Sequence, residues 1–98
     1  YWGLRFETDL FWQEELEDLA KRYPNFHAMT TLSKPTGAWT ESASRRKGRV
    51  TDHVIGKTPE LQSSEYYLCG TRQMIVDMRD LLTENGVPPE QIFTEAFF

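Results

Sequence analysis

The sequence predicts an α/β fold, a three-layer parallel sheet with helices on both faces. Short apolar segments typical of strands alternate along the 98 residues with segments whose apolar residues recur at helical spacing. This alternation favours parallel strands joined by right-handed crossovers that cover the faces of the sheet. The length corresponds to one small domain, residues 1–98.

The first half of the chain predicts a strand, a helix, a second strand and a long loop. Residues 1–4 form a short apolar segment, expected as a buried strand. Thr8 or Asp9 is expected to cap an acidic helix with one buried apolar stripe. A second strand is expected over residues 26–32. Residues 33–48 show no clear periodicity over more than about 12 residues, which indicates a functional or mobile loop.

The second half predicts a short helix or turn, a strand, a helix and a last strand. Residues 50–55 fit the short helix or turn, and residues 66–69 form a continuous apolar strand, expected to be buried on both faces. A helix with a methionine-rich core stripe follows from Thr71 and ends at Asn85-Gly86, where glycine permits a left-handed stop. Residues 92–95 fit the last strand.

Composition and charge exclude several classes of function. A net charge of -4 and a pI near 5.1 argue against nucleic-acid or anionic-membrane binding. No apolar run reaches the roughly 18 residues of a membrane helix. One cysteine forms no internal disulfide, so we expect a reducing compartment, the cytoplasm. His27 and His53 lack metal-ligand spacing, so we expect no metal.

Four predicted strand ends should meet at one edge of the sheet, because the strands are expected to be parallel. In such folds, ligands bind beyond the carboxyl ends of the strands. Gly70 would let a flat ligand lie against the backbone, and the Cys69 thiol could then contact its ring. Alternatively, Cys69 is a small buried hydrophobic residue and Gly70 only opens a turn. The segments at this edge are residues 3–5, 33–34, 69–70 and 95–97.

Cations accompany this edge. Arg5 can pair with a phosphate or carboxylate through its fork of donors. Ser33 and Lys34, with Arg49 and the basic run 45–47 nearby, could hold a phosphate. Alternatively, these charges are merely solvated. From the residues alone, the sequence predicts a nucleotide-like ligand at the edge of an α/β sheet.

Four stretches resemble the C-terminal pyridine-nucleotide domain of the ferredoxin–NADP reductase superfamily, in its order and spacing. They are "YWGLRFETDLFWQEEL", "MTTLSKPTGAW", "GRVTDHV" and "YYLCGTRQMIVDMRDLLTENGVPPEQIFTEAFF". Against that family, the sequence lacks the first strand with its phosphate loop, and the FAD domain. We therefore expect a domain truncated at its N-terminus, with self-association through the exposed sheet edge.

The resemblance implies a role for the end of the chain in hydride transfer. Cys69 and Gly70 would lie beside the nicotinamide and let it approach the flavin. Glu95 would help to order that pocket. Phe97 matches the terminal aromatic residue that stacks on the isoalloxazine ring. In plant-type members that residue is a tyrosine that ends the chain, whereas here Phe98 follows.

The resemblance also implies how the nucleotide is held. Arg5 would contact its pyrophosphate or ribose, and Thr71 could donate to the diphosphate. Ser33 and Lys34 match positions that grip the 2′-phosphate, with Arg49 as a helper. This favours NADP(H) over NAD(H). FAD would be bound mainly by a domain absent from this chain.

The implied function belongs to the parent protein. It would be an NAD(P)H-dependent flavoprotein reductase that passes electrons to a ferredoxin, a flavodoxin or a haem or iron–sulfur partner, and the isolated chain would be inactive. The alternative is a non-catalytic nucleotide-sensing or interaction domain with the same fold.

Overall fold

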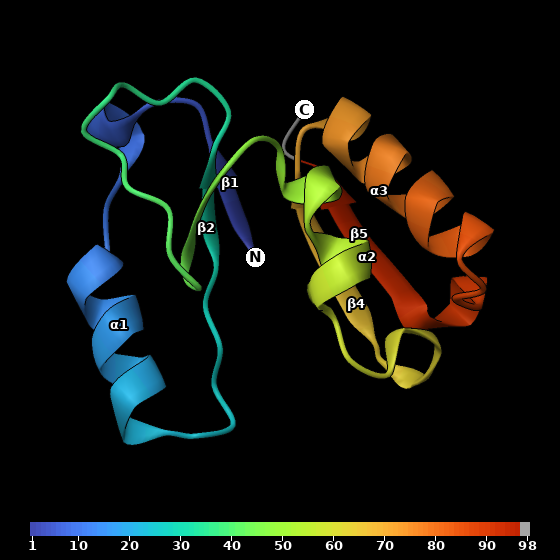
Figure 1. Cartoon of the computed structure of the whole chain (residues 1–98). Helices are drawn as coiled ribbons and strands as arrows, with labels where there is room; N and C mark the ends of the chain where they lie inside the picture. Colours follow the sequence, from blue (N-terminus) through green and yellow to red (C-terminus); the bar gives the residue numbers. More distant parts are fainter. Residues whose placement is uncertain (97–98) are drawn as a thin grey trace. The chain divides into compact units, whose positions relative to one another are not determined.

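Within residues 1–96, every strand runs parallel to its neighbour in the sheet. Figure 1 shows the whole chain. The computed structural model describes residues 1–96 and divides into two compact units, Tyr1–Asp52 and His53–Phe98. The prediction of an α/β fold with parallel strands is confirmed. That residues 1–98 act together as one nucleotide-binding domain stays a prediction.

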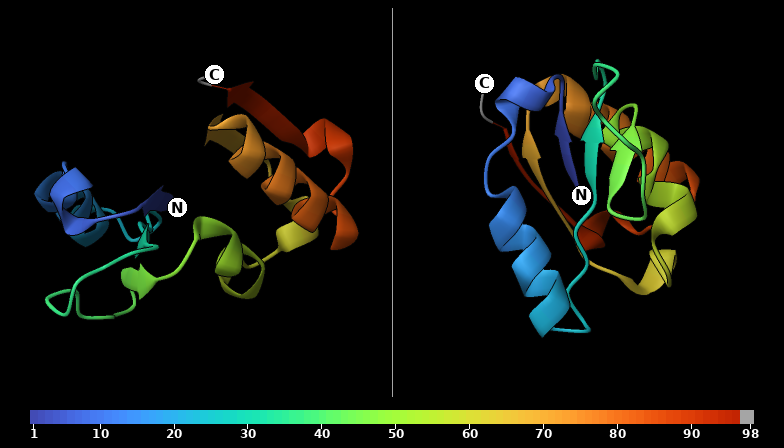
Figure 2. Two further views of the ribbon diagram at one scale, coloured as in Figure 1. Left: turned by 90° about the horizontal axis from the view of Figure 1, so that it is seen from above. Right: turned by 60° about the vertical axis from the view of Figure 1, so that its left-hand side comes forward.

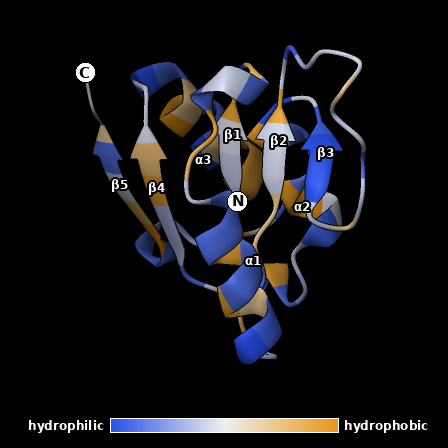
Figure 3. Cartoon of the chain, turned by 90° about the vertical axis from the view of Figure 1, so that its left-hand side faces the viewer, coloured by the Kyte–Doolittle hydropathy of each residue, from blue (hydrophilic) through white to orange (hydrophobic). Residues whose placement is uncertain are grey.

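The first unit contains a three-stranded sheet in the order β1-β2-β3 (Figure 3). Its strands are β1 (Trp2–Leu4), β2 (Thr30–Leu32) and β3 (Arg45–Lys47). All three residues of the central strand β2 are buried. Trp39 is also buried, and its indole N–H donates to the Arg46 carbonyl at 3.0 Å, which satisfies the ring's polar atom. The strand predicted over residues 26–32 is shorter than expected, because β2 begins only at Thr30.

The strand β3 corrects the prediction of an irregular loop over residues 33–48. Three consecutive basic residues give no strand signal in the sequence, but here they form an edge strand, where charge is tolerated. The Thr30 N–H donates to the Ser44 carbonyl at 2.9 Å, and the Gly48 N–H donates to the Leu32 carbonyl at 2.8 Å. These two hydrogen bonds lie at the two ends of the pairing between β2 and β3. Pairing with β2 across the sheet thus overrides local sequence preference.

Before the first long helix the chain makes a 3-10 turn, η1 (Glu7–Asp9), followed by α1 (Gln13–Arg22). The predicted cap is wrong. Trp12, with a φ of 60°, precedes the helix without a side-chain cap, and Asp9 instead accepts from the Phe6 N–H at 3.2 Å. The predicted buried stripe is wrong too, since no residue of α1 is buried.

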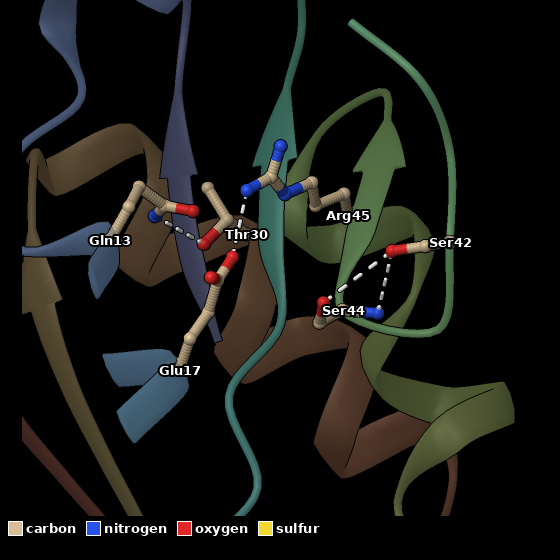
Figure 4. A network of polar contacts seen from close by, with 6 residues as sticks. All are labelled: Gln13, Glu17, Thr30, Ser42, Ser44 and Arg45. Atoms are coloured by element: carbon tan, nitrogen blue, oxygen red, sulfur yellow. Dashed lines mark hydrogen bonds and ion pairs between the residues drawn. The ribbon is translucent and has the colours of Figure 1, made fainter. Parts of the chain in front are cut away.

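Polar contacts connect α1 to the sheet beside which it runs (Figure 2, right). Gln13 donates to the Thr30 hydroxyl at 3.0 Å, and Arg45 pairs with Glu17 at 2.7 Å (Figure 4). Both members of the ion pair are about two-fifths exposed, so the pair contributes no more than about 1 kcal/mol.

The second unit contains a two-stranded sheet and one long helix. β4 (Tyr66–Gly70) pairs with β5 (Ile92–Ala96), and α3 (Arg72–Glu84) contacts both strands. The predicted strands and helix are confirmed. Shorter helices complete the chain: η2 (Val50–Asp52) in the first unit, then α2 (Val54–Lys57), η3 (Leu61–Ser63) and η4 (Pro89–Gln91).

The buried face of α3 supplies half of the second unit's buried apolar residues. Ile75, Met78 and Leu82 are buried, as the spacing predicts. Gly86 ends the helix with a φ of +87°, which glycine adopts without strain. The prediction that β4 is buried on both faces is wrong: residues alternate, and Tyr67 is 74% exposed.

No helix within residues 1–96 is long and apolar enough to cross a membrane.

Replacing Leu82 with alanine tests this core. Leu82 is 0% exposed, so the Leu82→Ala variant should lose about 2–5 kcal/mol of unfolding free energy through lost burial and a residual cavity. Urea denaturation measures the loss. Val76 lies on the same helix at 48% exposure, and Val76→Ala should change stability by about 0.5 kcal/mol or less. Equal effects of the two substitutions would contradict this assignment.

Self-association through strand edges is the second expectation. Within the described residues, β1 and β4 are each paired on one side only, and neither contains a charged residue that would oppose pairing with another chain. The opposite edges contain Arg45–Lys47 and Glu95. Light scattering should show a mass that rises with protein concentration. A constant monomer mass up to millimolar concentration would count against this prediction.

Candidate functional site

The main-chain ladder of the first sheet continues beyond the carboxyl ends of β1 and β2. The Ser33 N–H donates to the Leu4 carbonyl at 3.0 Å, and the Lys34 N–H donates to the Arg5 carbonyl at 2.8 Å. These bonds hold the segment after β1 beside the segment after β2. The structure thus brings together Arg5, Ser33 and Lys34, as the sequence predicts.

Arg49 lies two residues beyond the end of β3, the third strand of the same sheet. Gly48, its neighbour, bonds to Leu32 across β2 and β3, and the Arg49 N–H donates to the Asp52 carboxylate at 2.8 Å. The side chains of Arg5 and Lys34 are exposed and have no polar partner within residues 1–96. Arg5, Ser33, Lys34 and Arg49 form what we call the cationic edge.

Arg45, the first residue of the basic run of β3, is already engaged by other side chains. Arg45 is engaged with Glu17 at 2.7 Å and lies over the Trp39 ring, 5.4 Å from its centroid. These contacts hold its guanidinium toward α1 and Trp39.

A contact between Glu7 and Thr36, beside the cationic edge, was not predicted from the sequence. Both carboxylate oxygens of Glu7 accept from the Thr36 N–H at 3.0 Å, and the Thr36 hydroxyl also donates to this carboxylate. The hydroxyl and then the backbone N–H of Thr36 hold the pKa of the Glu7 carboxyl below its ordinary value. The two residues are 29 positions apart, so no local pattern reports the contact.

In the second unit, Cys69 and Glu95 are partners across β4 and β5. Cys69 is exposed, so the alternative that it is a small buried hydrophobic residue is wrong. Tyr67 and Phe93 precede this pair by two residues, so they lie on the same face, and their rings stack with centroids 5.0 Å apart. The Tyr67 hydroxyl donates to Glu65, and this hydrogen bond raises the pKa of the phenol.

The junction after β4 has the geometry that a glycine requires. Gly70 has a φ of +156°, and a Cβ there would stand 2.7 Å from the Met74 Cε atom. The flexible tip of Met74 thus already fills the space that a side chain would take. Thr71 caps α3, its hydroxyl oxygen accepting from the Met74 N–H at 3.2 Å, which leaves the hydroxyl proton for another acceptor.

Phe97 lies outside the described residues. The residues of the cationic edge belong to the first unit. The other predicted site residues that the structure describes belong to the second unit: Cys69, Gly70, Thr71 and Glu95. That both groups contact a single ligand stays a prediction.

Two further observations bound the chemistry. Within residues 1–96, no group of three or more histidine, cysteine, aspartate or glutamate residues could hold a metal ion. A cavity of about 330 Å³ lies between α1 and the amino ends of β2 and β3, lined in part by Leu16, Thr30 and Ser44. It opens at the end of the sheet opposite the cationic edge, and no sequence motif predicts it.

The contact between Glu7 and Thr36 makes stability depend on pH. Because the folded pKa of Glu7 is lowered, its contribution is fully present above the unfolded value of about 4.5 and is lost as the pH falls through the folded value. In an NMR titration, the Thr36 amide resonance should therefore shift with a midpoint below pH 4.5. In the Glu7→Gln variant this titration should vanish. A Thr36 amide that titrates at or above 4.5 would contradict the contact.

The sequence profile of the oxidoreductase NAD-binding domain family matches residues 1–80. The reductase component of propane 2-monooxygenase from Rhodococcus jostii (strain RHA1) is 34% identical over 102 residues, covering 99% of this chain and 26% of that protein. A second relative, from Ralstonia sp., is the ferredoxin--NAD(P)(+) reductase component of naphthalene 1,2-dioxygenase/salicylate 5-hydroxylase systems. It is 33% identical over 99 residues, covering 100% of this chain and 29% of that protein.

A solved structure shows the same fold. The crystal structure of the Amycolatopsis cytochrome P450 reductase GcoB superimposes with a TM-score of 0.83 at 23% identity, over 97% of this chain and 27% of that one. This chain thus spans less than a third of the length of these three proteins. On the profile match, the chain belongs to the oxidoreductase NAD-binding domain family, as its resemblance to ferredoxin–NADP reductases predicts.

Proposed function

We propose that this chain is the pyridine-nucleotide-binding part of an FAD-dependent reductase. The parent protein takes hydride from NAD(P)H and passes electrons to a ferredoxin, a flavodoxin, or a haem or iron–sulfur partner. The observation that carries the proposal is the cationic edge, in which the ladder bonds Ser33–Leu4 and Lys34–Arg5 hold two exposed basic residues on adjacent segments. Membership of an NAD-binding family supports a pyridine nucleotide as the ligand of this edge.

The names of the relatives support the electron-transfer role. Two are reductase components of oxygenase systems, and a third, 29% identical over 99% of this chain and 40% of its own length, is a probable flavin reductase of Aliivibrio fischeri. An oxygenase system is therefore the partner that we propose for the parent protein. The cytoplasm, predicted from the single cysteine, is part of the same proposal.

At the cationic edge, Lys34 and Ser33 bind the 2′-phosphate, with Arg49 as a helper, and Arg5 binds the pyrophosphate or ribose. A planar guanidinium suits an anion with several oxygens, and an ammonium suits a compact dianion as a point charge. The carboxylates beside this group are engaged within the chain, Glu7 by Thr36 and Asp52 by the Arg49 N–H, rather than left to accept ribose hydroxyls, which favours NADPH over NADH.

At the junction after β4, Cys69 and Gly70 orient the nicotinamide, and Thr71 donates its hydroxyl proton to the diphosphate. Glu95, the strand partner of Cys69, orders the pocket by hydrogen bonding. When bound, the nicotinamide and flavin supply the hydride chemistry themselves. Phe97 is proposed to cover the flavin ring, and none of the described residues is assigned to FAD. The 98 residues alone should therefore bind nucleotide without turnover.

A titration of the labelled chain with NADPH and with NADH tests the proposal. Amide shifts should cluster at Arg5, Lys34 and Gly70 and be larger for NADPH. Lys34→Ala should weaken NADPH binding about tenfold and leave NADH binding almost unchanged, because only NADPH carries the 2′-phosphate.

Lys21→Ala is the matched control, since it removes the same charge from the last turn of α1. It should leave both affinities within about twofold. Equal losses for both nucleotides in Lys34→Ala would contradict the 2′-phosphate assignment. A folded sample without shifts at any of these positions would overturn nucleotide binding by the isolated chain.

A further inference from the structure

We infer that Glu7 is a positioning residue, whose carboxylate holds the turn after β2 so that Lys34 stands beside Arg5 ready for a phosphate. The inference rests on the proposed function and deepens it. Glu7 itself does not touch the ligand, because its oxygens are engaged by Thr36.

Two cross-links enclose the turn. At its start, the Lys34 N–H donates to the Arg5 carbonyl at 2.8 Å. At its end, the Thr36 N–H and hydroxyl donate to the Glu7 carboxylate. Each cross-link joins the same two segments, residues 5–7 and residues 34–36. The segment that contains one cation is thus fastened to the segment that contains the other.

The residue between the cross-links stiffens the turn further. Pro35 fixes its own φ and removes one backbone donor, so little freedom remains between Lys34 and Thr36. Beyond Thr36, the Trp39 N–H donates to the Thr36 carbonyl at 3.2 Å, and Trp39 is only 5% exposed. Glu7 therefore connects the cationic edge to a buried side chain through Thr36.

Electrostatics alone would give Glu7 the opposite effect. A carboxylate close to an anion site repels the anion, so its removal should tighten binding if charge were all that mattered. Positioning predicts that removal weakens binding, because the turn then has to be ordered when the ligand binds. The sign of the effect therefore separates the two explanations.

The experiment compares Glu7→Gln and Glu7→Ala in the 98-residue chain. The probes are adenosine 2′,5′-bisphosphate, which carries the 2′-phosphate, and adenosine 5′-monophosphate, which does not. Glutamine keeps one acceptor for the Thr36 N–H, whereas alanine keeps none. We expect affinity for the bisphosphate to fall about threefold in Glu7→Gln and about tenfold in Glu7→Ala, with that for the monophosphate unchanged.

Glu14 provides the matched control. It is an exposed glutamate at the start of α1 with no polar partner within the described residues. Glu14→Gln and Glu14→Ala change the net charge by the same amount, and each should leave the bisphosphate affinity equal to or slightly above that of the wild type. In Glu7→Ala, but not in the Glu14 variants, the heteronuclear NOE of the Thr36 amide should also fall. Unchanged amide dispersion in β1, β2 and β3, as well as in the second unit, shows that the variants remain folded.

Two results would overturn the inference in different ways. If both Glu7 variants bind the bisphosphate as tightly as the wild type, then Glu7 does not position the turn. The same conclusion follows if both variants lose equal affinity for the bisphosphate and the Thr36 amide stays ordered. If the wild-type chain itself does not distinguish the bisphosphate from the monophosphate, the 2′-phosphate site fails, and the role of Glu7 at that site fails with it.

Discussion

The parallel main-chain ladder of the first sheet is the constraint on which the candidate site depends. Hydrogen bonds fix β1, β2 and β3 in register and continue past Leu4 and Leu32, so the segments that leave the sheet stay adjacent. Parallel pairing is what places all three exits at one edge. In an antiparallel sheet, Arg5 and Lys34 would leave at opposite ends.

The two units rely on different interactions. In the second, apolar residues of α3 together with Val54, Tyr66 and Val87 fill the core, so hydrophobic burial is the main stabilising term. In the first, two of the buried residues of β2 are threonines, and the Oγ1 atom of Thr31 has no hydrogen-bond partner. Polar contacts such as Gln13 with Thr30 therefore have a larger share in holding that unit together. A site for a charged ligand suits such a framework.

The sequence predicted those elements whose signals are local. The helix after Cys69-Gly70 has a threonine cap, a regular apolar stripe and a glycine stop, and all three appear in the structure. β3 was missed because its basic residues pair only through β2, which is distant in sequence. The start of α1 was wrong because Asp9 bonds to Phe6 in a separate turn. The role of Glu7 was not predicted either, because its partner Thr36 is 29 residues away in the sequence. Arg5 and Lys34, by contrast, were predicted because they follow predicted strands closely.

The arrangement of β2 has an evolutionary consequence. The strand itself is entirely buried, yet the next two residues, Ser33 and Lys34, are exposed. In the proposed 2′-phosphate site, substitutions at these two positions would alter what the molecule recognises without disturbing the buried strand. Selection, or an engineer, would then change the preferred nucleotide through one or two codons at the tip of a strand, while the neighbouring buried threonines keep the backbone in place.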